Sequence, residues 1–289
     1  MLHAFECTEK ENHRGHSGSI DHFLCDFCDL CGFKNSELSV ALGKKFPMRE
    51  LIACWQHTRM IVLIALCAAL YTAVLLAFKW LPIIPGITEI RPACVIPILF
   101  SVFFGPAAAW GSAFGNIVGD VLGGTIGPGS LFGFFGNFIF GYAPYRVLRT
   151  YSSEEKISLG PLVFGIFLAS SLCAVIIALG VDFLKLVPFS FLVHTIFLNN
   201  FVVSIFLGPL LIRGLQKRIY QMRLTYRQMM EPQEISGNAL KWAGPILVLA
   251  LMLLIYGVMM IPSLLTSAPG SVFKVSSTAI LFLASLILL

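Results

Sequence analysis

Charged residues are scarce in this sequence: they make up 12% of its 289 residues, whereas 57% are hydrophobic. A soluble domain carries about 25% charged residues, so this composition excludes an ordinary soluble protein. Between Arg91 and Arg146 the only formal charge is Asp120. The first 58 residues also lack the early apolar run of a secretory signal. The chain is therefore predicted to be an integral membrane protein.

Apolar runs long enough to cross a bilayer recur along the chain. A hydrocarbon core of about 30 Å takes roughly 20 residues of helix. The runs are continuous and lack the period-two alternation of a transmembrane barrel, so helices are the structure that satisfies the backbone in lipid. The fold class is thus all-α. The predicted spans are residues 60–79, 92–105, 107–126, 130–146, 161–181, 189–212, 242–262 and 271–289.

Basic residues divide unequally between the two sides of these spans. One side holds Lys44, Lys45, Arg49, Arg59, Arg146, Arg149, Lys156, Arg213, Lys217, Arg218, Arg223, Arg227 and Lys241, and the other holds Lys79, Arg91, Lys185 and Lys274. The positive-inside rule then predicts a multi-pass plasma-membrane protein whose amino terminus and basic loops are cytoplasmic. This asymmetry, with attraction to anionic lipid, explains the net charge of +5 without nucleic-acid binding.

The polar tail, residues 1–58, concentrates cysteine and histidine. Cys25, Cys28 and Cys31 share a three-residue repeat with His22, and such thiolates and imidazoles are typical zinc ligands in a reducing cytosol. An iron–sulfur loop is less well matched because its fourth cysteine and following proline are missing. Alternatively, translation starts at Met48 or Met60 and the tail has no function. Zinc in this tail is the only cofactor expected.

Small residues line one face of the first span, where Ala65, Ala69 and Ala73 recur every four residues. Such faces drive helix association in lipid. The second span ends in Phe-Gly-Pro at 104–106, the third and fourth spans are rich in Gly and Asn, and the sixth ends with Gly208-Pro209 and a basic tail. Over about residues 60–220 this combination resembles the substrate-binding (S) components of energy-coupling factor (ECF) transporters.

The resemblance implies a six-helix substrate-binding domain at residues 59–220. Such a domain captures a vitamin or similar micronutrient from outside, and its alanine face docks on a membrane coupling subunit that works with two ATPase subunits. The chain itself has no G-x-x-x-x-G-K-[ST] loop for nucleotide phosphates, and no arrangement of side chains predicts an enzyme. Residues 221–289, a basic linker and a two-helix hairpin, lie outside the resemblance.

Polar residues within or beside the spans are the candidate substrate ligands. With the predicted orientation they gather toward the external face, as a binder that loads from outside requires. The candidates are Glu89, Arg91, Asn116, Asp120, Asn137, His194, Asn199 and Asn200. Asn199 and Asn200 point about 100° apart on a helix, so at most one is expected to contact substrate.

Asp120 is the most informative candidate because a carboxylate deep in a membrane helix costs about 2.5 to 3.5 kcal/mol. It is expected either to accept hydrogen bonds from substrate, with Arg91 nearby, or to make a structural bond between helices. Two other functions are compatible with the sequence. One is a self-sufficient secondary transporter that uses Asp120 as an ion or proton site, and the other is a metal-sensing membrane protein that works through its Cys/His tail.

Overall fold

The computed structural model describes residues 48–79, 82–84, 88–89, 91–151, 157–230, 243–260 and 280–285. The chain divides into two compact units, residues 1–46 and 47–289, and the described residues all belong to the second. The predicted zinc ligands Cys25, Cys28, Cys31 and His22 lie outside the described residues, so metal binding there stays a prediction.

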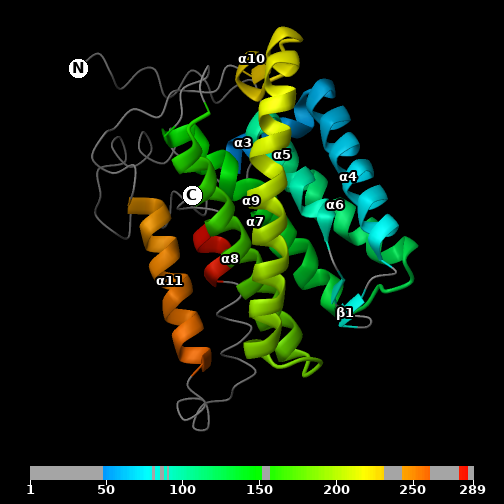
Figure 1. Ribbon diagram of the computed structural model, residues 1–289, viewed down its shortest axis with the longest axis vertical. Coiled ribbons are helices and arrows are strands. Elements are labelled where there is room, and N and C mark those ends of the chain that lie inside the picture. Colours follow the sequence, from blue (N-terminus) through cyan, green and yellow to red (C-terminus); the bar gives the residue numbers. More distant parts are fainter. Residues whose placement is uncertain are drawn as a thin grey trace, which may run out of the picture. The chain divides into compact units, whose positions relative to one another are not determined.

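The second unit is built mainly from helices (Figure 1). They are α3 (Met48–Ala53), η1 (Cys54–Gln56), α4 (Thr58–Phe78), η2 (Pro92–Cys94), α5 (Val95–Phe104), α6 (Ala107–Leu122), α7 (Pro128–Tyr151), α8 (Leu159–Phe183), α9 (Phe189–Gln221), α10 (Tyr226–Met230) and α11 (Ala243–Met260). Residues 280–285 are also helical. Strands β1 (Pro82–Ile84) and β2 (Thr88–Glu89) pair antiparallel between α4 and η2.

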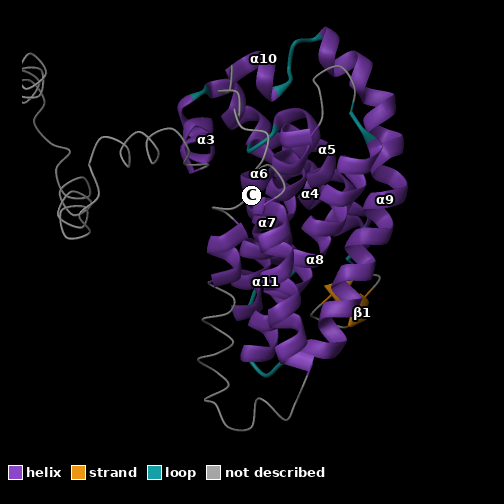
Figure 2. Ribbon diagram, turned by 90° about the vertical axis from the view of Figure 1, so that its left-hand side faces the viewer, coloured by secondary structure: helices purple, strands orange, loops and turns teal. Residues whose placement is uncertain are grey.

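These helices confirm an all-α membrane protein, although the β1–β2 hairpin was not predicted and α9 continues to Gln221 beyond the span predicted to end at residue 212. Of the last predicted span, 271–289, only residues 280–285 are described. Within the described residues three segments are long and apolar enough to cross a membrane: α4, α8 and the stretch Phe189–Met230, which includes α9 and α10. α5 and α6 are shorter, with 10 and 16 residues. Figure 2 shows the hairpin at one end of the helices and α10 at the other, named here the hairpin end and the α10 end.

The unit begins earlier than the domain boundary predicted at residue 58. Leu51 and Cys54 are buried in the same core as the long helices, and the indole N–H of Trp110 donates to the carbonyl oxygen of Leu51 at 3.0 Å. From the sequence alone this short apolar segment is placed with the polar tail, because its hydrophobic residues are too few to stand out from the preceding charges.

A glycine ends α5, and a proline lies inside α7. Gly105 has φ of +57° and ends α5, a conformation that other residues adopt only with strain. Pro144 lies inside α7, where it has no N–H to donate to the preceding turn. The next amide, that of Tyr145, donates to the Ser101 hydroxyl oxygen at 2.8 Å, which ties this part of α7 to α5.

α4 packs on a row of glycines in α6. Gly111, Gly115 and Gly119 recur every four residues, and a Cβ at Gly115 would lie 2.9 Å from the carbonyl oxygen of Ala68. The two backbones therefore approach closely, as in small-xxx-small packing. Because the backbones are this close, the Thr72 hydroxyl can donate a hydrogen bond to the carbonyl oxygen of Gly115 at 2.8 Å.

Replacing Gly115 by leucine should lower the unfolding midpoint of the protein in detergent. Its side chain would meet backbone atoms of α4, which cannot move aside as a flexible side chain can, and overpacking of this kind costs about 1–3 kcal/mol. Gly214→Leu is the matched control because nothing lies within 4 Å of a Cβ at Gly214 in α9. Equal midpoints for the two variants would contradict close α4–α6 packing.

α11 lies against α8 and α9, whereas the neighbours of α4 are α5, α6 and the adjoining 3-10 turns. In Figure 1 α4 and α11 accordingly lie on opposite sides of α7 and α9. From the last predicted span, Phe282 contacts Phe135 and Phe138 of α7, with ring centroids 5.0 and 6.0 Å apart. The described parts of the C-terminal two-helix hairpin, α11 and residues 280–285, thus pack on the bundle and do not cover α4.

Candidate functional site

A chain of hydrogen bonds links α4, α6 and α7 through two buried amides. The Tyr71 hydroxyl donates to Oδ1 of Asn137 at 2.8 Å. The Asn137 amide donates to Oδ1 of Asn116 at 3.1 Å, and the Asn116 amide donates to Asp120 at 3.3 Å. Asn116 and Asn137 are only 2% and 1% exposed. We name these four residues the amide cluster. It brings together three of the predicted substrate ligands.

Asp120 is the last residue in this series of hydrogen bonds, and it lies next to Lys79. Nζ of Lys79 lies 3.7 Å from Oδ1 of Asp120, and the two side chains are 15% and 18% exposed. Lys79 also donates to the carbonyl oxygen of Gly119 at 3.0 Å and to the hydroxyl of Thr125. The Thr125 hydroxyl in turn donates to Oδ1 of Asp120 at 3.5 Å. The cation that the structure places on Asp120 is therefore Lys79 rather than the expected Arg91.

A second polar group, named here the thiol–amide cluster, joins η2, α8 and α9. The Cys94 thiol donates to Oδ1 of Asn200 at 3.0 Å, and the Asn200 amide donates to Sγ of Cys173 at 3.6 Å. Beside them, the backbone N–H of Arg91 donates to Oδ1 of Asn199 at 3.2 Å. Asn200 is buried and Asn199 is half-buried, so the neighbouring amides face different surroundings, as their helical positions predicted.

Two buried hydroxyls continue this polar strip between α8 and α9. Ser170 lies one turn before Cys173, and Ser204 lies one turn after Asn200. Both are fully buried, and within the described part of the chain neither hydroxyl oxygen has a hydrogen-bond partner. Buried hydroxyls normally find partners, so this strip retains capacity to bind a water or a polar ligand group.

The remaining predicted ligands lie apart from these clusters. His194 is exposed on α9, where its Nδ1 lies 2.6 Å from the carbonyl oxygen of Ser190 and its Nε2 lies 3.0 Å from the hydroxyl of Tyr256. It thus connects α9 to α11. Glu89 belongs to strand β2, and its side chain is outside the described part. In the described residues no group of three His, Cys, Asp or Glu side chains could hold a metal ion.

The alanine face of α4, defined by Ala65, Ala69 and Ala73, is exposed along its length. The opposite face of the helix is buried and includes Cys67 and Tyr71, which face the glycines of α6. Its two faces are therefore distinct: one completes the bundle, and the other presents small side chains at the surface.

Residues 61–217 match a family model described as QueT transporter. The chain belongs to the QueT transporter family. This match confirms the resemblance to ECF S components and identifies a substrate-binding subunit of a transporter in a multi-pass membrane protein. Comparison with curated proteins and with solved structures finds no significant match.

The QueT match covers α4 to most of α9 and contains the alanine face and every predicted substrate ligand. α3, α10, α11 and the Cys/His tail lie outside the matched residues. Sequence reasoning missed Tyr71, Lys79 and Thr125 as members of the site. Lys79 carried a signal, a lone cation at the end of a span, but nothing in the sequence paired it with Asp120.

Proposed function

We propose that this QueT-family protein is the substrate-capture subunit of an ECF-type importer. It binds a queuosine precursor, or a related modified base, at the hairpin end. It then docks through the alanine face of α4 on a membrane coupling subunit that works with two ATPase subunits. In the predicted orientation the hairpin end faces outward and the amino terminus is cytoplasmic.

The exposed alanine face is the observation that carries this proposal. α4 already buries one side against α6, so the alanines are not needed to hold the bundle together. In lipid, helices associate through close packing of small residues rather than by the hydrophobic effect. The added α11 packs on α8 and α9, which leaves this face accessible to a partner helix.

The amide cluster supports a base-like substrate. A modified base is flat and carries hydrogen-bond donors and acceptors along its edge, which side-chain amides and a carboxylate can match. Asp120 supplies an acceptor for base N–H groups, and the ammonium of Lys79 lies 3.7 Å from the same carboxylate. The substrate enters by replacing bonds that Asn116, Asn137 and Asp120 now make with one another.

Reconstitution in liposomes tests the proposal against a self-sufficient secondary transporter. The purified protein alone should bind a queuosine precursor but accumulate none under a proton or sodium gradient. Accumulation should require the coupling subunit, both ATPases and ATP, because only ATP hydrolysis drives the cycle. Gradient-driven uptake by the protein alone would instead establish the secondary carrier with Asp120 as its ion site.

A further inference from the structure

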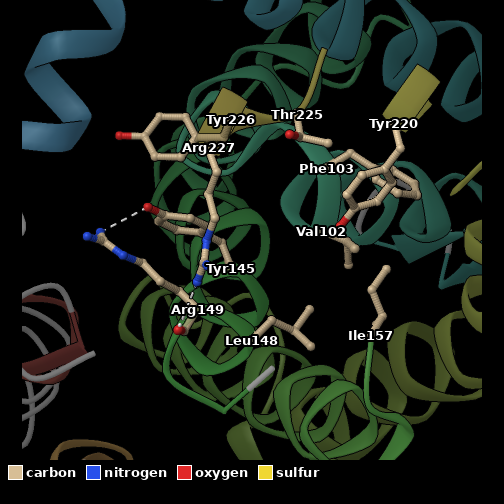
Figure 3. Close-up of a pocket in the computed structure, with 10 residues that line it drawn as sticks. All are labelled: Val102, Phe103, Tyr145, Leu148, Arg149, Ile157, Tyr220, Thr225, Tyr226 and Arg227. Atoms are coloured by element: carbon tan, nitrogen blue, oxygen red, sulfur yellow. Dashed lines mark hydrogen bonds between the residues drawn. The ribbon is translucent and has the colours of Figure 1, made fainter. Parts of the chain in front are cut away.

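Buried polar groups in this protein usually have hydrogen-bond partners, as the residues around the pocket at the α10 end show (Figure 3). Arg149 there donates to the Tyr145 hydroxyl at 3.1 Å, and Nη2 of Arg227 donates to the carbonyl oxygen of Arg149 at 3.2 Å. Among the described residues, Ser170 and Ser204 are exceptions: both are fully buried, and neither hydroxyl has a partner. Buried hydroxyls without partners are rare in native proteins, so this pair requires a physical cause.

Neither serine hydroxyl uses the nearest acceptor on its own helix. A serine inside a helix commonly donates to the carbonyl oxygen four residues earlier. Ser171, the next residue of α8, does this and donates to the carbonyl oxygen of Phe167 at 2.8 Å. Ser170 and Ser204 make no such bond within the described part of the chain. Their hydroxyls are therefore directed away from the backbone acceptors of α8 and α9.

The two serines lie opposite each other between α8 and α9. Contacts on both sides of them set the alignment of the helices. The Asn200 amide donates to Sγ of Cys173 at 3.6 Å, and Cδ1 of Ile166 would lie 3.7 Å from a Cβ at Gly208. On each helix the serine is three or four residues from both contacts, and residues with this spacing share a helix face. The two hydroxyls therefore face the same interhelical space.

This space is wider at the serines than at the contact one turn away. There the long side chain of Asn200 reaches across to Cys173. A serine side chain is shorter than that of asparagine, and the two hydroxyls make no hydrogen bond to each other. One water that makes two hydrogen bonds of about 2.8 Å spans a gap of about 5 Å. Buried waters in proteins typically bind such unsatisfied polar groups.

We propose that one water molecule is bound between Ser170 and Ser204 and joins α8 to α9 by a hydrogen bond to each hydroxyl. A hydroxyl both donates and accepts, so one neutral water satisfies the two serines without any charge. Both serines lie within predicted spans, where lipid offers no hydrogen-bond partners and the groups must be satisfied internally. The water extends the thiol–amide cluster by one turn toward the α10 end. The α8–α9 contact is then bridged by water, whereas α4 and α6 rely on close backbone packing.

Alanine substitutions in the purified full chain test whether the two serines share a ligand. Ser170→Ala and Ser204→Ala should each lower the unfolding midpoint in detergent by about 2–4 °C, because either change removes one of the two bonds of the water. The double variant should lower the midpoint little further, because the shared water is lost only once. Ser171→Ala is the matched control on α8 and should have little effect, since that hydroxyl bonds its own helix. Midpoints that rise in the single variants would show dry, unsatisfied hydroxyls, and additive decreases would show two separate sites.

X-ray hydroxyl-radical footprinting, read by mass spectrometry, tests whether the shared ligand is water. Irradiated bound water releases radicals in place, so buried side chains beside it are oxidised. Cys173 should be oxidised several times more than Cys67, although both are fully buried, because Cys67 packs directly against Gly111 of α6. The double alanine variant should bring Cys173 down to the level of Cys67. Equal oxidation of the two cysteines in the original protein would overturn the water. Oxidation of Cys173 that disappears when a queuosine precursor is added would assign the hydroxyls to the substrate instead.

Discussion

Ala69→Phe should abolish assembly of the protein with the ECF coupling subunit while leaving substrate binding intact. Ala69 is the central residue of the alanine face and is exposed. A phenyl ring at this position would therefore not clash with the rest of this protein. It would hold a partner helix several ångströms further away, and the close contacts that stabilise small-xxx-small pairs would be lost. ATP-driven uptake should then fall to background.

The experiment compares co-purification with a tagged coupling subunit and binding of a queuosine precursor by the isolated protein. Val202→Phe is the matched control: Val202 is 44% exposed on α9, and the change adds the same ring to another lipid-facing helix. It should assemble normally. If Ala69→Phe still assembles, the docking surface lies elsewhere; if it loses binding as well, the alanine face belongs to the fold rather than to an interface.

The helices could be predicted well from the sequence because membrane insertion leaves a strong local signal. Continuous apolar runs without charge predict the ends of α4 and α8 to within about two residues, whereas α9 continues to Gln221, past the predicted end at residue 212. What the sequence could not show was the β1–β2 hairpin, whose strands of three and two residues are too short to have an alternating pattern, and the packing of residues 48–56. Both depend on contacts with distant segments rather than on local composition.

The candidate site was predicted as a set of residues but not as an arrangement. Asn116 and Asp120 share a helix face because they are four residues apart, and their link could have been inferred. The link from Asn116 to Asn137 depends on how α6 and α7 align, and the link from Asp120 to Lys79 depends on how α4 aligns with the glycines of α6. Such alignments are set by packing across many residues, so no single motif reveals them.

Asp120→Ala should weaken binding of a queuosine precursor about 10- to 100-fold. A hydrogen bond to a charged group contributes about 1.5–3 kcal/mol, and Asp120 is the one carboxylate of the amide cluster. The variant should also be less stable, because it leaves the ammonium of Lys79 in a mostly buried position without its carboxylate. We expect a loss of about 1–3 kcal/mol, below the value for breaking a fully buried ion pair.

The double variant Asp120→Ala with Lys79→Ala separates the two roles. Removing both charges together avoids the cost of an unpaired one, so the unfolding midpoint should recover toward that of the original protein. Binding should not recover, because the acceptor for the substrate is still missing. Thermal unfolding in detergent and calorimetric titration measure the two effects on the same samples. A double variant that regained both stability and affinity would show that Asp120 only joins helices, and the substrate would have to be held by the thiol–amide cluster instead.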